Sequence, residues 1–480
     1  MFNKFSYKLA NFTVNYSNLM KSKNRTYIIA FLLIIISSSK SIAQQNSLAY
    51  NVELNAGISS EETLPFWMTA NKFGNIPNEN YGLVKGALFK EFLNNENDFD
   101  ISFKSSFLSS FSKEDSKVII EELNLNLRYK NWILELGNKH DDILWEGLSS
   151  SNGNIIKSTN TRAVPGINLK TDGYIQLPFA KNWLTTNMNF AEHFLTDKRF
   201  VDNAQLHHKS LYLKSKLSDK LNLITGLEHY AIWGGTSETF GEQPNSFKDF
   251  IKVITGAAGN EESDPGEQIN ALGNHLGQYY IEFNYNGDNT NWNFYWSHLF
   301  EDRSGREMIN YPDALYGLFL DLKQPEHIIS HILFEYTHTK HMSGTEGFSG
   351  FDNYFNNRIY QSGWTYFGRT IGSPFFPTRE TENGLTEGIL GSHNRFSSVN
   401  IGLKGFINPT LSYKTNVSYT SYPGWFDTPI NEKQLSGVFE LFVNHHNLPF
   451  QLSVGAAVDS GDFLPNNVGG FVKLIKSGKF

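Results

Sequence analysis

The sequence predicts an all-β protein, a transmembrane antiparallel β-barrel of about 18 strands with long loops and a short helix filling the lumen. Three observations predict this class. Apolar and polar residues alternate with a period of two along much of the chain. Short turns alternate with long insertions, and after residue 43 no apolar stretch reaches the length of a membrane-spanning helix. A β-sandwich or propeller would also show period two, but no blade-like repeat occurs.

The alternation is clearest between Phe99 and Phe111. Odd positions there read Phe, Ile, Phe, Ser, Phe, Ser, Phe, and even positions read Asp, Ser, Lys, Ser, Leu, Ser. Period two places the two sets on opposite faces of a strand. Candidate strands of about 8–12 residues, long enough to cross a bilayer when tilted, recur near Tyr50, Val84, Ile101, Leu123, Ile133, Tyr174, Met188, Leu211, Leu223, Ile281, Phe294, Leu318, Ile332, Val399, Val417, Phe439, Val454 and Val472.

The connections differ in length from one to the next. Residues 130–131, 218–220 and 287–289 read as tight hairpin turns, whereas residues 137–168, 234–277 and 344–394 are long insertions. This asymmetry is typical of periplasmic turns and extracellular loops. Within the second insertion, Ser246 begins a capping-box pattern followed by apolar residues at helical spacing, and Gly256 ends it. We expect this helix to pack into the barrel mouth.

The first 43 residues predict an export signal. A basic stretch at 20–25 precedes an apolar run at 27–36 and an A-x-A-like site ending at Ala43. We therefore interpret residues 1–43 as an N-terminal extension plus a cleaved signal peptide, with Met20 as the true start, and residues 44–480 as one barrel domain. The final strand ends on Phe480, as in the sorting signal of outer-membrane barrels.

Composition narrows the function classes. The net charge is −7, so no basic face is available for nucleic acid. The chain has no cysteine, which excludes disulfides, thiolate metal sites and Cys nucleophiles. No G-x-S-x-G motif, phosphate-binding loop or H-E-x-x-H motif occurs. We predict no enzyme activity, no metal and no cofactor.

Five segments together resemble the Wzi-type capsule assembly family: residues 64–74 (LPFWMTANKFG), 206–213 (LHHKSLYL), 271–277 (ALGNHLG), 300–305 (FEDRSG) and 351–369 (FDNYFNNRIYQSGWTYFGR). The resemblance implies a Gram-negative outer-membrane barrel with a filled lumen. It also implies a non-catalytic, monomeric protein that binds and anchors capsular or other surface polysaccharide, as a lectin, and takes part in capsule assembly. Its partners would be the polysaccharide and outer-membrane lipid. Family members also carry a helical bundle at the periplasmic end, but residues 44–84 show no three-helix pattern.

The segment 351–369 combines aromatic rings with amide, carboxylate and guanidinium groups, the side chains that stack on sugar rings and bond their hydroxyls. The candidate polysaccharide-binding residues are Asp352, Asn353, Tyr354, Asn356, Asn357, Arg358, Tyr360, Trp364, Tyr366 and Arg369, together with Glu301, Asp302 and Arg303. The same composition would also satisfy the polar atoms of a loop that plugs the lumen. Trp132, Trp145, Trp183 and Trp425 are expected in a membrane-interface girdle.

Two other functions stay open on the sequence. One is an outer-membrane diffusion channel or substrate-specific porin, which the number of long, aromatic-rich loops disfavours. The other is a soluble secreted β-protein or an outer-membrane enzyme. The carboxylates of Glu301 and Asp302 are adjacent, so on a strand they would point to opposite faces and could not flank one glycosidic bond.

Overall fold

A computed structural model describes residues 48–92, 98–114, 116–261, 263–324, 326–345, 352–445 and 447–480. The predicted signal peptide, residues 1–43, lies outside these ranges. In the described part of the chain, no helix has the length and apolar character needed to cross a membrane.

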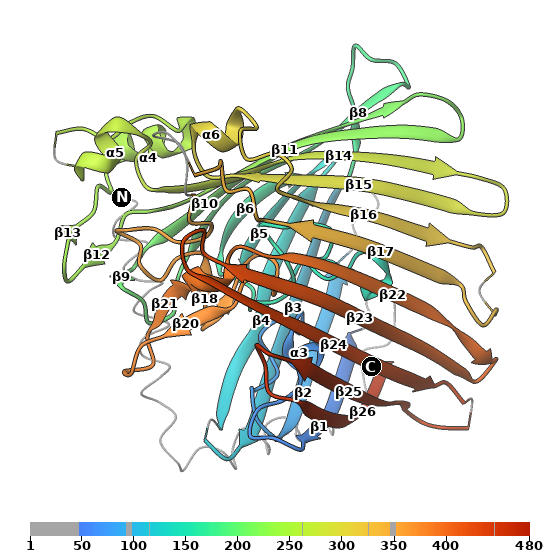
Figure 1. Ribbon diagram of the computed structural model, residues 1–480. Coiled ribbons are helices and arrows are strands. Elements are labelled where there is room, and N and C mark those ends of the chain that lie inside the picture. Colours follow the sequence, from blue (N-terminus) through green and yellow to red (C-terminus); the bar gives the residue numbers. More distant parts are fainter. Residues whose placement is uncertain are drawn as a thin grey trace.

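The dominant element is a closed antiparallel barrel of 18 strands, as the sequence predicts (Figure 1). Its strands are β1 (Ala49–Ser59), β2 (Tyr81–Phe92), β3 (Phe99–Ser112), β4 (Lys117–Tyr129), β5 (Trp132–Asn138), β6 (Gly166–Thr171) continued by β7 (Ile175–Gln176), β8 (Leu184–Phe194), β10 (Gln205–Lys216), β11 (Leu221–Trp233), β14 (Asn274–Asn286), β15 (Asn291–Phe300), β16 (Ala314–Asp321), β17 (His331–His338), β22 (Ser397–Asn408), β23 (Leu411–Gly424), β24 (Pro429–Val443), β25 (Gln451–Gly461) and β26 (Asn467–Lys479). Each strand pairs with its neighbour in sequence, and β26 pairs with β1 to close the ring, with Leu54 opposite Leu474.

The remaining elements are short and lie in the connections. They are α3 (Phe66–Thr69), η1 (Trp145–Gly147), β9 (Val201–Asp202), β12 (Thr236–Ser237), β13 (Gly241–Glu242), α4 (Phe247–Thr255), α5 (Pro265–Ile269), α6 (Arg303–Arg306), β18 (Thr365–Tyr366), β19 (Arg369–Thr370), β20 (Thr378–Glu380), β21 (Thr386–Ile389) and η2 (Gly391–His393). Between residues 48 and 84 the chain forms β1, the single turn α3 and the start of β2, consistent with the lack of a three-helix pattern there.

The two ends of the barrel differ. At one end, tight links such as residues 130–131 between β4 and β5 and 287–290 between β14 and β15 join the strands. At the other end lie the long connections 139–165, 234–273 and 339–396, close to the predicted insertions. We call these the short-turn end and the long-loop end. Both β1 and β26 have their free termini at the short-turn end.

The alternation sorts the side chains between outside and lumen. On β11, Leu227 is exposed on the outer face, whereas Glu228 and Tyr230 are buried on the inner face. Outer apolar side chains such as Phe107 and Phe283 are likewise exposed, while Gln278 is buried. The barrel therefore has an apolar exterior and a lumen wall that carries many polar groups.

The lumen is filled by a plug built from the described residues of the connections 60–80, 139–165 and 339–396. Its core contains Leu148, Ile155, Trp364, Phe376 and Phe396, all fully buried. These side chains pack against inward wall residues from several strands, namely Tyr230, Ile232, Tyr280, Tyr295, Leu299, Leu315 and Leu333. Helix α3 lies in the lumen as well, since the Trp67 indole N–H donates to the Ser418 hydroxyl of β23.

Two placements differ from the sequence-based expectations. Helix α4 forms where predicted, but its Phe250 and Val253 pack against Trp233 and Ala231, outward residues of β11, so the helix lies on the outer face and not in the barrel mouth. Trp145 was expected in the membrane girdle. It lies in the lumen, where its ring stacks on Tyr295 at 4.9 Å. Both errors arise because a local pattern shows that a surface is apolar but not which partner covers it.

Candidate functional site

The plug is tied to the wall by a buried carboxylate. Glu335 on β17 is fully buried. It accepts hydrogen bonds from the Ser149 hydroxyl at 2.6 Å, the Ser150 N–H at 2.7 Å, the Ser150 hydroxyl at 2.6 Å and the Tyr295 hydroxyl at 2.5 Å. These four hydrogen bonds satisfy both oxygens of the buried side chain. This contact fixes the connection 139–165 inside the barrel.

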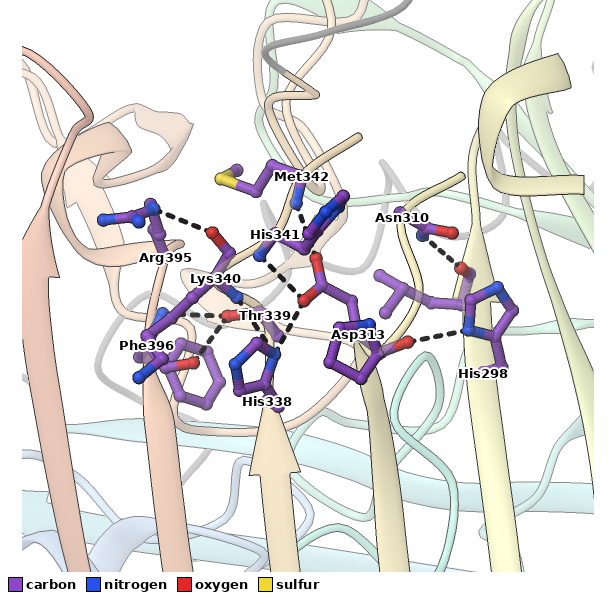
Figure 2. Close-up of polar contacts among 12 residues, drawn as sticks. His298, Asn310, Asp313, His338, Thr339, Lys340, His341, Met342, Arg395 and Phe396 are labelled. Carbon is purple, nitrogen blue, oxygen red and sulfur yellow. Dashed lines mark hydrogen bonds and ion pairs between the residues drawn. The ribbon is translucent and has the colours of Figure 1, made fainter. Parts of the chain in front are cut away.

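A second tie holds the start of the 339–396 connection at the rim (Figure 2). Asp313, fully buried just before β16, accepts bonds from His338 at 2.8 Å and from the His341 and Met342 N–H groups at 2.9 and 2.7 Å. Its backbone carbonyl lies 2.8 Å from the His298 ring, as the figure shows. The Tyr354 hydroxyl also donates to Asp313, at 2.7 Å, so this carboxylate joins three strand ends to the plug.

Four aromatic residues of the candidate set lie in the interior of the plug. Tyr354, Tyr360, Trp364 and Tyr366 are all nearly or fully buried. Each polar atom has a partner: the Trp364 indole N–H donates to the Ile156 carbonyl at 2.6 Å, and the Tyr366 hydroxyl lies 2.8 Å from that of Thr196. In this conformation these rings are covered by protein.

The structure brings the two candidate segments together. Glu301 accepts the Phe355 N–H at 2.6 Å. The Ser304 hydroxyl lies between Asp302, at 2.5 Å, and Asp352, at 3.5 Å. Burial raises the pKa of Asp352 to about 6, with nearby Asp302 adding to the effect. Burial likewise raises the pKa of Glu301 well above its usual range.

The remaining candidates divide between loop structure and the surface. Asn353, Asn356 and Asn357 bond mainly within the plug; for example, Asn356 accepts from the Ile389 N–H at 2.7 Å. Arg358 is exposed and pairs with Asp264 at 2.6 Å. Arg303 is exposed and pairs with Glu307 at 2.7 Å. These three asparagines and two arginines do not converge on one point.

A cavity of about 300 Å³ lies between the plug, the wall strands β23 and β24, and the connection that follows β25. We call it the rim cavity. Its lining combines aromatic rings, hydroxyls, amides and one guanidinium: Phe66, Asn78, Arg369, Phe375, Thr378, Thr420, Tyr422, Gln434, Ser436 and Phe463 are among the residues. Its size is near the lower end of small-ligand sites. Only Arg369 of the thirteen candidates lines it.

Arg369 is a cation without a carboxylate partner among the described residues. Its guanidinium donates to the carbonyls of Thr69 and Ile76, the latter at 2.9 Å, and to the Asn78 side chain at 2.8 Å. Burial, and then the neighbouring cation Arg162, lower its pKa to about 10. The guanidinium stays charged at neutral pH, and the cavity wall around it is therefore electropositive.

A second cavity, of about 210 Å³, lies between the plug and the strands β4, β5, β6, β8 and β10. Its charged groups are largely paired with one another. Lys139 and Lys170 both contact Glu135, at 2.6 and 2.9 Å, and Lys157 pairs with Asp141. Within the described ranges, no group of three or more His, Asp or Glu side chains is placed to hold a metal ion.

Sequence reasoning missed most of the rim-cavity lining. Asn78, Tyr422, Gln434 and Phe463 come from separate connections and strands and stand in no shared motif. Only strand alternation could have placed Gln434 and Ser436 on one inward face. The cavity exists because distant segments meet, which no local pattern records.

The family model described as capsule assembly protein Wzi matches residues 41–398. The chain belongs to this family. None of the curated proteins matches the chain in sequence. Among solved structures, Wzi of Escherichia coli, an outer-membrane, carbohydrate-binding β-barrel involved in group 1 capsule assembly, is 12% identical with a TM-score of 0.55, over 95% of this chain and 89% of that one. Pseudomonas aeruginosa OccK3 is 10% identical, with a TM-score of 0.49 over 91% of this chain and 96% of that one. The likeness to Wzi concerns the fold.

Proposed function

We propose that the chain is an outer-membrane protein that binds surface polysaccharide at the rim cavity and holds the polymer at the cell without catalysing a reaction. The long-loop end would face outward, because barrels of this class have short periplasmic turns and long outer loops. Membership of the capsule assembly family supports this role, as does the carbohydrate binding named for the E. coli Wzi barrel.

The observation that carries the proposal is the Arg369 guanidinium, which has no carboxylate partner among the described residues and lines a cavity of aromatic rings and hydroxyls. Sugars offer apolar ring faces and many hydroxyls, which match Phe463, Gln434 and Thr420. A uronate or another acidic substituent would supply the carboxylate that Arg369 lacks, and such charge-assisted pairs are among the stronger hydrogen bonds. Acidic polysaccharide is therefore the ligand class that fits this lining.

The candidate residues then take different roles. Arg369 would contact the polymer directly. Tyr354, Tyr360, Trp364 and Tyr366 would support it, because they build the plug that forms one side of the cavity. The exposed arginines Arg303 and Arg358 remain candidates for outer contacts with a long chain, with Asp302 beside them at the surface.

The first test compares Arg369→Gln with Arg379→Gln, a matched loss of one loop guanidinium that pairs with Glu387 outside the cavity. Binding of acidic polysaccharide from the source organism to the purified full chain is measured by titration calorimetry. Loss of a charged hydrogen bond is worth about 1.5–3 kcal/mol, so Arg369→Gln should weaken binding roughly tenfold or more. Equal affinities for both variants and the parent would refute the role of the rim cavity.

The second test asks what the protein does in the cell. In a deletion strain, surface polymer is quantified as cell-bound and released fractions. Normal total polymer found mainly in the medium supports anchoring. Unchanged retention contradicts it, and loss from both fractions points instead to export or assembly.

The diffusion-channel alternative is separated by conductance. The plug core is fully buried at Leu148, Trp364 and Phe396, which favours a blocked lumen. Steady single-channel currents from the unmodified chain in planar bilayers would favour a diffusion channel over a polysaccharide anchor.

A further inference from the structure

Helix α4 is firmly fixed on the outside of the barrel. Ser246 and Asp249 form a reciprocal capping box, and Gly256 ends the helix with a left-handed φ of 64°. The ammonium of Lys209, an outward residue of β10, donates to the Ile254 carbonyl. Phe250 and Val253 bury one side of the helix against β11. The exposed side therefore belongs to an ordered element with a set orientation.

The helix lies just beyond the apolar belt of the barrel. On the outer face, Leu227 of β11 is exposed and stands opposite Tyr279 of β14. Ala231, which α4 covers, is four residues further toward the long-loop end. At about 3.4 Å per residue and a tilt near 45°, the helix sits roughly 10 Å above that level. This height corresponds to the headgroup region of a bilayer.

The exposed part of α4 includes two large apolar side chains. Phe247 is 77% exposed and Ile251, one turn later, is 46% exposed. Neighbouring connections add Ile269 of α5, 74% exposed, and the exposed side chains of Met308, Ile309 and Tyr311. The segment that carries Met308, Ile309 and Tyr311 follows Arg306. The hydroxyl of Tyr279, an outward residue of β14, donates a hydrogen bond to the Arg306 carbonyl. We call these six side chains the outer collar; α4, α5 and α6 gather at one side of the rim in Figure 1.

The charged side chains near the outer collar favour a lipid neighbour over a protein or solvent neighbour. Lys248 and Lys252 flank Phe247 and Ile251 on the same helix. Three acidic groups near these side chains are engaged: Asp264 pairs with Arg358, Glu307 pairs with Arg303, and Glu267 accepts the Gly273 N–H. Aromatic and aliphatic side chains with adjacent lysines, at headgroup height and continuous with the lipid-facing belt, form the pattern of a helix that lies in a membrane interface.

We propose that the outer collar is a membrane-interface anchor, in which Phe247 and Ile251 enter the outer leaflet and Lys248 and Lys252 contact anionic lipid phosphates. The proposal rests on the membrane location given under the proposed function, but not on polysaccharide binding. Its consequence is that α4 limits how the rim on this side of the barrel tilts and rotates in the leaflet.

The absence of cysteine makes a direct test simple, because one introduced thiol carries the only label. Ile251→Cys is compared with Glu382→Cys, an exposed position in the polar hairpin between β20 and β21. Each full-length variant is labelled with an environment-sensitive fluorophore and reconstituted in vesicles of phosphatidylcholine with phosphatidylglycerol. Heat-modifiable gel migration verifies that the barrel is folded and inserted.

The expected result is blue-shifted emission at position 251, loss of intensity with spin-labelled lipid, and protection from iodide; position 382 should show the opposite. Adding Lys248→Glu to the first variant should reduce the lipid quenching in phosphatidylglycerol-containing vesicles only. Iodide quenching at position 251 equal to that at 382, in folded protein, would overturn the proposal and leave the collar as a surface for a soluble partner.

Discussion

Replacing Glu335 with Gln tests whether the plug depends on the buried tie to β17. The carboxylate uses both oxygens, one for the Ser149 and Tyr295 hydroxyls and one for the N–H and hydroxyl of Ser150. A glutamine amide keeps one oxygen, which can face the Ser150 N–H and hydroxyl, and then points its NH₂ group at the Ser149 and Tyr295 hydroxyls. Both hydroxyls lose their acceptor, and the Ser149 oxygen already accepts the Ser151 and Gly153 N–H groups. Each buried donor left without an acceptor costs about 1–3 kcal/mol. We expect about 3 kcal/mol in total.

The assay is amide hydrogen exchange in the folded, detergent-solubilised chain. A local cost of about 3 kcal/mol should speed exchange of the Ser150 amide roughly a hundredfold. Glu440→Gln is the matched control: Glu440 is also buried, but its hydrogen bonds go to Ser453 and Lys473 of the wall, and the plug cation that its charge acts on, Lys72, belongs to the 60–80 connection and not to the segment of Ser150. Unchanged exchange at Ser150 in Glu335→Gln, or an equal rise in Glu440→Gln, would refute the tie.

Three further outcomes follow from the same structure. Burial raises the pKa of Asp352 to about 6, so ionisation of this carboxyl lowers the stability of the fold as pH rises from about 4 to 6. Asp352→Asn should remove this part of the decline in thermal midpoint between pH 4 and 6. Below pH 4 the thermal midpoint should change little. In Gly317→Ala the new methyl group would overlap the Tyr295 ring, since an added Cβ lies 2.0 Å from a ring atom. Amide exchange in the plug should therefore rise as in Glu335→Gln. Unchanged exchange would contradict the close packing of Tyr295 on Gly317. Trp364→Phe removes a buried indole and its 2.6 Å bond, and should lower the free energy of unfolding in urea by about 2–4 kcal/mol, whereas a surface-like change below about 0.5 kcal/mol would exclude a core role.

The barrel wall was largely predictable because its signal is local. Seventeen of the predicted centres fall within a wall strand, and the remaining one, Tyr174, falls between β6 and β7. The strand breaks there because Gly173 takes a left-handed φ of 68°, which interrupts pairing with β8. The period-two pattern remains recognisable despite such breaks, because one face of each strand lies on the apolar exterior and the other faces the plug.

The candidate site was only partly predictable, because its contacts are distant in sequence. Glu335 meets Ser150 across 185 residues, and Arg369 meets Ile76 across 293. Composition identified 351–369 as rich in aromatic and polar groups, but could not separate rings that build the plug from groups that face a cavity. Arg369 differs from Arg358 only in what the fold places beside it: neutral carbonyls in one case and Asp264 in the other.

The plug segments share one property that bears on assembly. The connections 60–80, 139–165 and 339–396 all enter the lumen from the long-loop end, while β1 and β26 meet along their whole length to seal the wall. Ring closure joins chain ends more than 400 residues apart and carries the largest entropic cost of contact formation. Among the described residues, no segment enters the lumen from the short-turn end, so none of them has to be threaded before that seam forms. The wall can therefore close first and the interior can fill afterwards, so that defects such as Glu335→Gln should spare biogenesis and affect only the finished protein.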